Sequence, residues 1–244
     1  MKGVDCFHRV NEKDNKQARH FFKEAINIDN DSAMAYVMLG FTHLLDLSYG
    51  WSKSPIESFE QAEKNAEKAL ALNDSFDLAH GLLGWIYLYK RQYDEAIKAG
   101  EQAIELSPSG AEAHVNLGLT LVFSDKIESA IKLLERALRL NPFPQPYYYS
   151  NLAIAYRYNG QDENAIEMCK KALRGSPNNI TPYITLAASY SSLNRIEEAR
   201  KAVEEILRIH PRFTLERHAN VLPFKNQKKL DKYIDALRKA GLPE

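Results

Sequence analysis

The sequence predicts an all-α protein in which antiparallel helix pairs stack into a solenoid. A leucine followed by glycine or alanine recurs at steps of 34, 35 and 34 residues, beginning at Leu83, Leu117, Leu152 and Leu186. An alanine column keeps the same steps at Ala96, Ala130, Ala165 and Ala199, and a proline column keeps them at Pro108, Pro142, Pro177 and Pro211. Because several independent columns share one register, the repeat is an internal period of the fold.

Each column has a physical role in a helix pair. The small residues allow two helices to approach closely, and Leu83 and Tyr87, one turn apart, lie on the same helical face. Proline follows the second helix and ends it, because it has no N–H with which to continue the hydrogen-bond ladder. The turn between the two helices needs a residue that tolerates positive φ, and Asp125, Gly160 and Asn194 stand there. Arg91 occupies the equivalent position in an earlier unit.

This pattern resembles the tetratricopeptide repeat, a helix–turn–helix unit of about 34 residues. The resemblance implies a right-handed superhelix in residues 1–213. It divides this range into a partial first unit, 1–32, and full units at about 33–76, 77–110, 111–144, 146–179 and 180–213. Residues 4–12 look like an incomplete first helix, which raises the interpretation that the chain is a fragment of a longer protein.

Ten extra residues separate the two halves of the unit at 33–76, around Leu47–Pro55. We expect a surface excursion there, because turns accept added length at little entropic cost. We expect Trp51 to fold back over the exposed end of the solenoid.

Residues 214–244 are predicted to form a C-terminal capping segment. Asn226 is a suitable N-cap for a helix that ends at Gly241. Its apolar residues form one stripe at Leu230, Tyr233, Ile234 and Leu237. A repeat array needs such a cap, because its last core face would otherwise meet water.

A second resemblance concerns the C-terminal region. Leu222-Pro223-Phe224-Lys225 and the closing residues 237–244 are similar to the end of repeat regions in bacterial signalling proteins with a class III adenylate/guanylate cyclase domain. The residues 49–51 and 14–18 are similar too. This resemblance implies an accessory or regulatory role and implies no cyclase activity, because the catalytic domain would lie upstream.

Composition disfavours several classes of partner. Lysine plus arginine and aspartate plus glutamate number 32 each, so the net charge is zero and bulk attraction to nucleic acid is not expected. We find no apolar run long enough to cross a bilayer, so no membrane partner is expected. The two cysteines, Cys6 and Cys169, are too few for a disulfide framework, which favours a cytoplasmic location.

The sequence predicts neither an enzyme nor a cofactor or metal site. No nucleophile elbow, zinc-protease motif or phosphate-binding loop is present. His80 and His114 share one column, but they lack a nearby carboxylate at ligand spacing, so packing is the favoured interpretation. Catalytic and metal-binding residues are therefore predicted to be absent.

Function is expected on the concave face, where residues of the first helices that are unused for pair packing point into a groove. These candidates are mostly apolar, and a soluble protein seldom exposes a large apolar patch without a partner. The predicted partner-binding residues are Phe41, Leu45, Trp85, Leu88, Tyr89, Leu119, Val122, Phe123, Ile154, Arg157 and Tyr158. The alternative is that they pack against neighbouring units.

The leading hypothesis is a scaffold that binds a protein or peptide segment in this groove, with Trp85, Phe123 and Tyr158 as anchors. Homo-oligomerisation through the groove or the N-terminal end is a further possibility, and we expect the groove to be occupied by a neighbouring chain, a terminus or an additive. One subclass of this family grips the C-terminal carboxylate of chaperones with groove lysines. The matching positions here hold no lysine, so that activity is disfavoured.

Two other functions compete with the scaffold. One is a regulatory or dimerising C-terminal module of a multidomain signalling protein such as a cyclase. The other is an enzyme of the glycosyltransferase kind, which would need a separate catalytic domain for which no stretch of this chain is left. If the groove hypothesis holds, changing Trp85 and Phe123 to serine together should leave the fold intact.

Overall fold

The structure is a computed structural model that describes residues 2–244, and every regular element in this range is an α-helix. Met1, the first residue of the predicted partial unit, lies outside the described residues. The helices are α1 (Lys2–Phe7), α2 (Glu12–Ile28), α3 (Ala33–Ser48), α4 (Pro55–Leu72), α5 (Asp77–Tyr89), α6 (Tyr93–Leu106), α7 (Ala111–Phe123), α8 (Ile127–Leu140), α9 (Pro146–Tyr158), α10 (Asp162–Gly175), α11 (Ile180–Ser192), α12 (Ile196–Ile209), α13 (Leu215–Val221) and α14 (Gln227–Ala240). The all-α prediction is confirmed. Within the described range, no helix is both long and apolar enough to cross a membrane.

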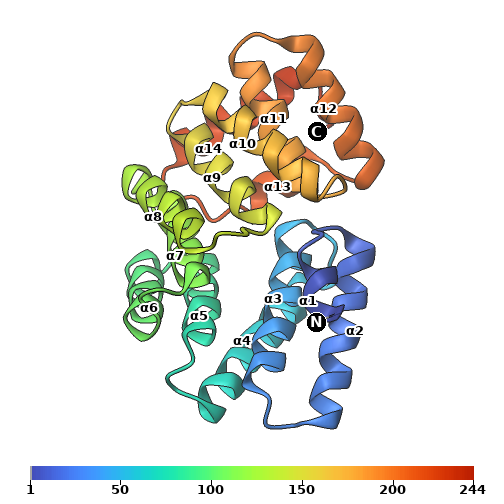
Figure 1. Ribbon diagram of the computed structural model, residues 1–244. Coiled ribbons are helices and arrows are strands. Elements are labelled where there is room, and N and C mark those ends of the chain that lie inside the picture. Colours follow the sequence, from blue (N-terminus) through green and yellow to red (C-terminus); the bar gives the residue numbers. More distant parts are fainter. Residues whose placement is uncertain (1) are drawn as a thin grey trace.

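Five helix pairs form the body of the molecule, from α3 with α4 to α11 with α12 (Figure 1). From α5 to α12 the first helix of each pair has 13 residues and the second has 14. Consecutive first helices also contact one another, α3 with α5, α5 with α7, α7 with α9 and α9 with α11. The first helices therefore share one side of the array, as the solenoid prediction requires.

The small residues lie where two helices meet. Each alanine of the column Ala96, Ala130, Ala165 and Ala199 is completely buried. At Gly118, a Cβ atom would lie 2.7 Å from Cγ of Leu134 on the paired helix α8, which is closer than carbon atoms pack. The columns recur because a larger side chain at these positions would push the paired backbones apart.

The turns inside the pairs also follow the sequence. The predicted positions all have positive φ: 58° at Arg91, 66° at Asp125, 76° at Gly160 and 60° at Asn194. Arg91 is the least expected of these, because a long side chain there loses the local hydrogen bonding that eases the conformation for aspartate and asparagine.

The ten extra residues near Leu47–Pro55 are distributed over three elements. Helix α3 is three residues longer than α5, α4 is four longer than α6, and the connection at 49–54 is three longer than the one at 90–92. The expected surface excursion was therefore wrong for most of the insertion, because lengthening both helices of a pair extends their mutual contact.

The connection at 49–54 is also partly buried. Trp51 is only 6% exposed, and its ring stacks on that of Tyr49 with centroids 4.9 Å apart. The Tyr49 hydroxyl is hydrogen-bonded to Thr181 of α11, 132 residues further along the chain. Together with the contact between α3 and α13, this bond brings the first full pair against the last one.

The N-terminal region forms a shorter pair. Helix α1 ends at Phe7, Val10 adopts positive φ at 46°, and α2 begins after Asn11, whose side chain caps it by accepting from the Asp14 amide. The expected first helix over 4–12 was therefore wrong in its second half, which is a turn. The His8 ring lies 4.7 Å from that of Tyr147 on α9, so this pair also faces the centre of the molecule.

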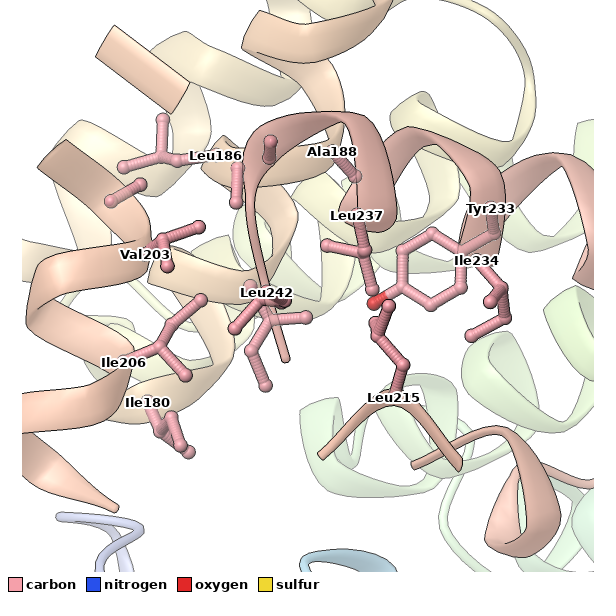
Figure 2. Close-up of a cluster of buried hydrophobic side chains, with 14 of the residues drawn as sticks. Ile180, Leu186, Ala188, Val203, Ile206, Leu215, Tyr233, Ile234, Leu237 and Leu242 are labelled. Atoms are coloured by element: carbon pink, nitrogen blue, oxygen red, sulfur yellow. The ribbon is translucent and has the colours of Figure 1, made fainter. Parts of the chain in front are cut away.

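The C-terminal segment forms two helices, α13 and α14. Helix α14 begins after its N-cap Asn226 and ends at Gly241 with φ of 102°, as predicted. All four residues of its apolar stripe are buried. Figure 2 shows side chains of α14, including Tyr233 and Leu237, in one cluster with Leu215 of α13 and residues of α11 and α12. The cap thus extends the core beyond the last pair, and α13 is an element that the sequence analysis missed.

We predict that Ala130→Leu lowers stability by about 1–3 kcal/mol, because the larger side chain cannot fit between α7 and α8 without moving them. Urea unfolding followed by circular dichroism measures the change. Ala71→Leu on α4 is the matched control, because Ala71 is exposed and the same substitution there should have little effect. If Ala130→Leu and the control unfold alike, the assignment of this column to the helix contact is wrong.

Candidate functional site

The first helices enclose a cavity of about 330 Å³ at the centre of the molecule. Side chains from α3, α5, α7, α9 and α11 form its walls. Helix α1 and residues of the C-terminal segment complete the lining, so both ends of the chain help to enclose it. The volume falls at the lower end of the range of about 300–1,000 Å³ that is common for ligand pockets.

Most of the predicted groove residues line this cavity. The structure brings together Phe41, Leu45, Trp85, Tyr89, Leu119, Phe123, Ile154, Arg157 and Tyr158. Leu88 and Val122 are not part of the lining and are almost completely buried between helices. Neighbouring first helices contact one another, so positions on the flanks of the groove face the next helix and cannot reach a partner.

Aromatic rings are linked along the end of the cavity where α5, α7 and α9 terminate. Trp85 lies 6.5 Å from Phe123, which is 5.0 Å from Phe224. Phe224 is 4.8 Å from Tyr158, and Tyr158 is 5.2 Å from Tyr233. Edge-to-face pairs at these separations add to the stability gained from burial.

Phe224 belongs to the connection between α13 and α14, residues Leu222–Asn226, which we call the C-terminal strap. The Lys225 amide donates to the carbonyl of Phe123, and Arg91 donates to the carbonyl of Phe224, both at 2.9 Å. The side chain of Asn226 donates to Asp125. The strap thus bonds to the ends of α5 and α7 and fills one end of the groove, where the sequence analysis expected a terminus, a neighbouring chain or an additive.

The strap changes the interpretation of Phe123. Its side chain is only 7% exposed and packs between Trp85 and Phe224. The Trp85→Ser, Phe123→Ser double variant was expected to leave the fold intact. Because Phe123 holds the strap, that variant would also remove a core contact, so unfolding would not separate a binding role from a structural one.

The other end of the cavity is formed by residues that the sequence analysis did not select. Glu112, in the first turn of α7, accepts hydrogen bonds from the hydroxyls of Tyr147 and Tyr148. Burial and this carboxylate raise the pKa of both tyrosines, so their hydroxyls remain protonated donors. Only the Glu112–Tyr147 spacing, one repeat apart, could have indicated this cluster.

Charges in the cavity are few. Among the described residues of its lining, Glu112 is the only carboxylic acid and Arg157 is the only arginine or lysine. Burial lowers the pKa of His8 and of His218 to about 4 each, so both rings are neutral. Arg157 faces Asp162 at the start of α10, with 3.3 Å between Nε and Oδ1. No group of three or more metal-ligating side chains occurs in residues 2–244.

We predict that Phe224→Ala destabilises the C-terminal end by about 3–5 kcal/mol, because Phe224 is buried between the aromatic rings of Phe123 and Tyr158. Urea unfolding measures the loss, and amide hydrogen exchange should show reduced protection in α14. Phe143→Ala is the matched control, because Phe143 is 87% exposed. Equal stability of the two variants would show that the strap is not anchored by Phe224.

Comparison with known sequences and structures agrees with this architecture. A tetratricopeptide repeat family model matches residues 87–153 and 157–219, and a second model of the same repeat matches residues 57–111. A search of curated proteins finds no match to this chain.

Similar solved structures share the fold at low sequence identity. A chain of the APC/C hetero-tetramer Cut9–Hcn1 is 18% identical over 94% of this chain, with a TM-score of 0.65. This chain spans only 40% of the length of that chain. TTC0263, a thermophilic TPR protein of Thermus thermophilus, is 19% identical, with 85% of this chain and all of its own covered and a TM-score of 0.61. PilW, a type IV pilus biogenesis factor, is 19% identical, with 85% and 88% covered and a TM-score of 0.60. On the extent of the family match, the chain belongs to the tetratricopeptide repeat family.

Proposed function

We propose that this protein is an interaction scaffold that binds a segment of a partner polypeptide at the central cavity. The observation that carries the proposal is the cavity itself, about 330 Å³ in volume and lined mainly by apolar and aromatic side chains. Because these side chains surround a space, they lack part of the close packing of a protein interior. Such a loss of packing normally lowers the stability of the fold. An apolar side chain inserted from a partner would recover that packing.

The volume of the cavity suits one or two side chains of a partner. Leu45, Leu119 and Ile154 offer apolar contacts from α3, α7 and α9, and Trp85 of α5 offers a large aromatic face. Buried aromatic anchors commonly contribute about 2 kcal/mol or more each to binding. The protein has no net charge, so we expect association to depend only weakly on salt.

The finer interpretations from the sequence stay predictions. The family match and the structural neighbours do not bear on the cyclase resemblance, so a regulatory role in a longer signalling protein is untested. The same holds for homo-oligomerisation, for the absence of catalytic activity and for the absence of nucleic-acid binding. We propose a cytoplasmic location, which the free thiols of Cys6 and Cys169 support.

Filling the cavity tests the proposal. Leu45→Trp places an indole in the space without removing buried apolar area, so the variant should fold as stably as the parent. Linear peptides selected from a random phage-displayed library on the parent should bind Leu45→Trp at least tenfold more weakly. A tenfold loss corresponds to about 1.4 kcal/mol. Isothermal titration measures the affinities, and circular dichroism checks the fold.

Leu106→Trp is the matched control, because Leu106 lies at the end of α6, outside the cavity lining, and is 36% exposed. It should leave peptide affinity unchanged. Peptides that bind the parent and Leu45→Trp equally well would place the binding surface elsewhere. Failure to select any peptide on the parent would contradict the proposal as a whole.

A further inference from the structure

The cavity contains one carboxylic acid, Glu112, for which the described lining provides no cationic partner. Arg157 is the only arginine or lysine of that lining, and its Nε lies 3.3 Å from Oδ1 of Asp162. Glu112 belongs to the first turn of α7 and Arg157 to the last turn of α9, so most of the length of a 13-residue helix, about 15 Å, separates them. Burial keeps the rings of His8 and His218 neutral by lowering the pKa of each.

The hydrogen bonds that Glu112 makes leave part of its accepting capacity unused. A carboxylate offers about four lone-pair sites. Tyr147 and Tyr148 donate their hydroxyls to Glu112, and both donors are neutral. The start of α7 adds only a partial positive charge. A full opposite charge at Glu112 must therefore come from a ligand.

Aromatic rings lie beside the same carboxylate. The Tyr147 ring, whose hydroxyl bonds to Glu112, is 4.7 Å from the ring of His8, and His8 is 5.6 Å from Phe7. Tyr147, His8 and Phe7 all line the cavity. The faces of tyrosine and phenylalanine rings attract cations. These surroundings therefore favour a cation as the ligand of Glu112.

The walls next to Glu112 are apolar and extend to the surface. Met38, Leu78 and Val115 belong to the first two turns of α3, α5 and α7, and all three line the cavity. Met34, in the first turn of α3, also lines the cavity and is 46% exposed. The lining thus reaches solvent at the end where the first helices begin, which is the end that contains Glu112.

A lysine side chain is the cation that best matches this end. Its apolar stem packs on apolar walls while the ammonium group stays at the polar tip. An arginine pairs best with two free carboxylate oxygens, but here each oxygen of Glu112 already accepts from a tyrosine hydroxyl. A metal ion needs more ligands than one carboxylate, and the part of the chain that the structure describes has no cluster of three or more ligating side chains.

We propose that the partner segment bound in the cavity presents a lysine ammonium group to Glu112, next to an apolar anchor on the same segment. This inference rests on the proposed scaffold function and specifies the chemistry of the segment. The ammonium group donates to the unused lone pairs of Glu112, and the apolar anchor occupies the space beside Leu119 and Ile154. Salt screens such a partly buried ion pair less than it screens a pair on the surface.

The test compares the peptides that the same library yields on the parent and on Glu112→Gln. Peptides selected on the parent should be enriched in lysine beside an aromatic or aliphatic residue. Replacing that lysine by norleucine removes the ammonium group and keeps a four-carbon apolar chain. The replacement should weaken binding to the parent at least tenfold and should leave binding to Glu112→Gln unchanged, as measured by isothermal titration.

Glu128→Gln is the matched control. Glu128 occupies the first turn of the next helix, α8, where it is exposed and outside the cavity lining. This variant should keep the preference for lysine. Glu112→Gln retains an amide oxygen that accepts from a tyrosine hydroxyl, so it should fold like the parent by circular dichroism.

A pair of small probes provides a measurement that depends on no variant. Hexylamine and 1-hexanol share one apolar chain and differ in charge, and tryptophan fluorescence follows their binding because Trp85 lines the cavity. The parent should bind hexylamine at least tenfold more tightly than 1-hexanol. Equal affinities for the two probes would overturn the inference.

The peptide outcomes separate this inference from the proposed function. Selected peptides that have apolar anchors but no preference for lysine would retain the scaffold proposal and overturn this one. A lysine preference that persists in Glu112→Gln would overturn it too, because the ammonium group would then bind elsewhere. Failure to select any peptide on the parent would contradict both proposals, even if hexylamine binds.

Discussion

Close approach of two helix backbones at alanine and glycine positions is the constraint on which the rest of this structure depends. At Gly84 of α5 a Cβ atom would lie 3.2 Å from the backbone oxygen of the buried Ala96 of α6, and at Gly118 of α7 the missing side chain makes room for Leu134 of α8. Repetition of this contact in each pair stacks the first helices side by side. A row of first helices in turn creates one continuous wall, and the cavity lies against it.

The array would remain open if the repeats alone determined the fold. Two non-repeating elements close it. The Tyr49–Trp51 connection reaches α11 through Thr181, and the C-terminal strap bonds to the ends of α5 and α7. In a repeat protein each unit is stabilised mainly by contacts with the adjacent units. Contacts between the first and last pairs therefore couple the stability of two units that would not touch in an open solenoid. Closure also converts an apolar groove, which a partner could cover, into a cavity that a partner must enter.

The repeat was predictable because the packing of each helix pair requires the same residue types at the same positions of every unit. The small-residue columns, the positive-φ positions and the apolar stripe of α14 all follow from local geometry that recurs in the sequence. The same reasoning identified Trp85, Leu119 and Ile154 as groove residues, because their spacing leaves them outside the pair contact. It misplaced Leu88 and Val122, whose burial depends on the angle between neighbouring first helices. No pattern within a single helix encodes that angle.

Long-range contacts explain the other differences. Tyr49 and Thr181 are 132 residues apart, and nothing in either segment predicts that they meet. The pairing of Phe224 with Phe123 and Tyr158 likewise depends on the path of a connection that has no periodicity. The buried nitrogen atoms of Trp85 and His218 that have no hydrogen-bond partner among residues 2–244 become visible only when α5 and α13 are placed around one space. The chemistry of the candidate site is thus a property of the closed array.

A crystal structure of the protein with a library-selected peptide would test most directly whether the cavity is the working surface. The account predicts an apolar side chain of the peptide between Leu45, Leu119 and Ile154, with the first helices otherwise unchanged. A peptide bound across the second helices, with the cavity unaltered, would contradict it.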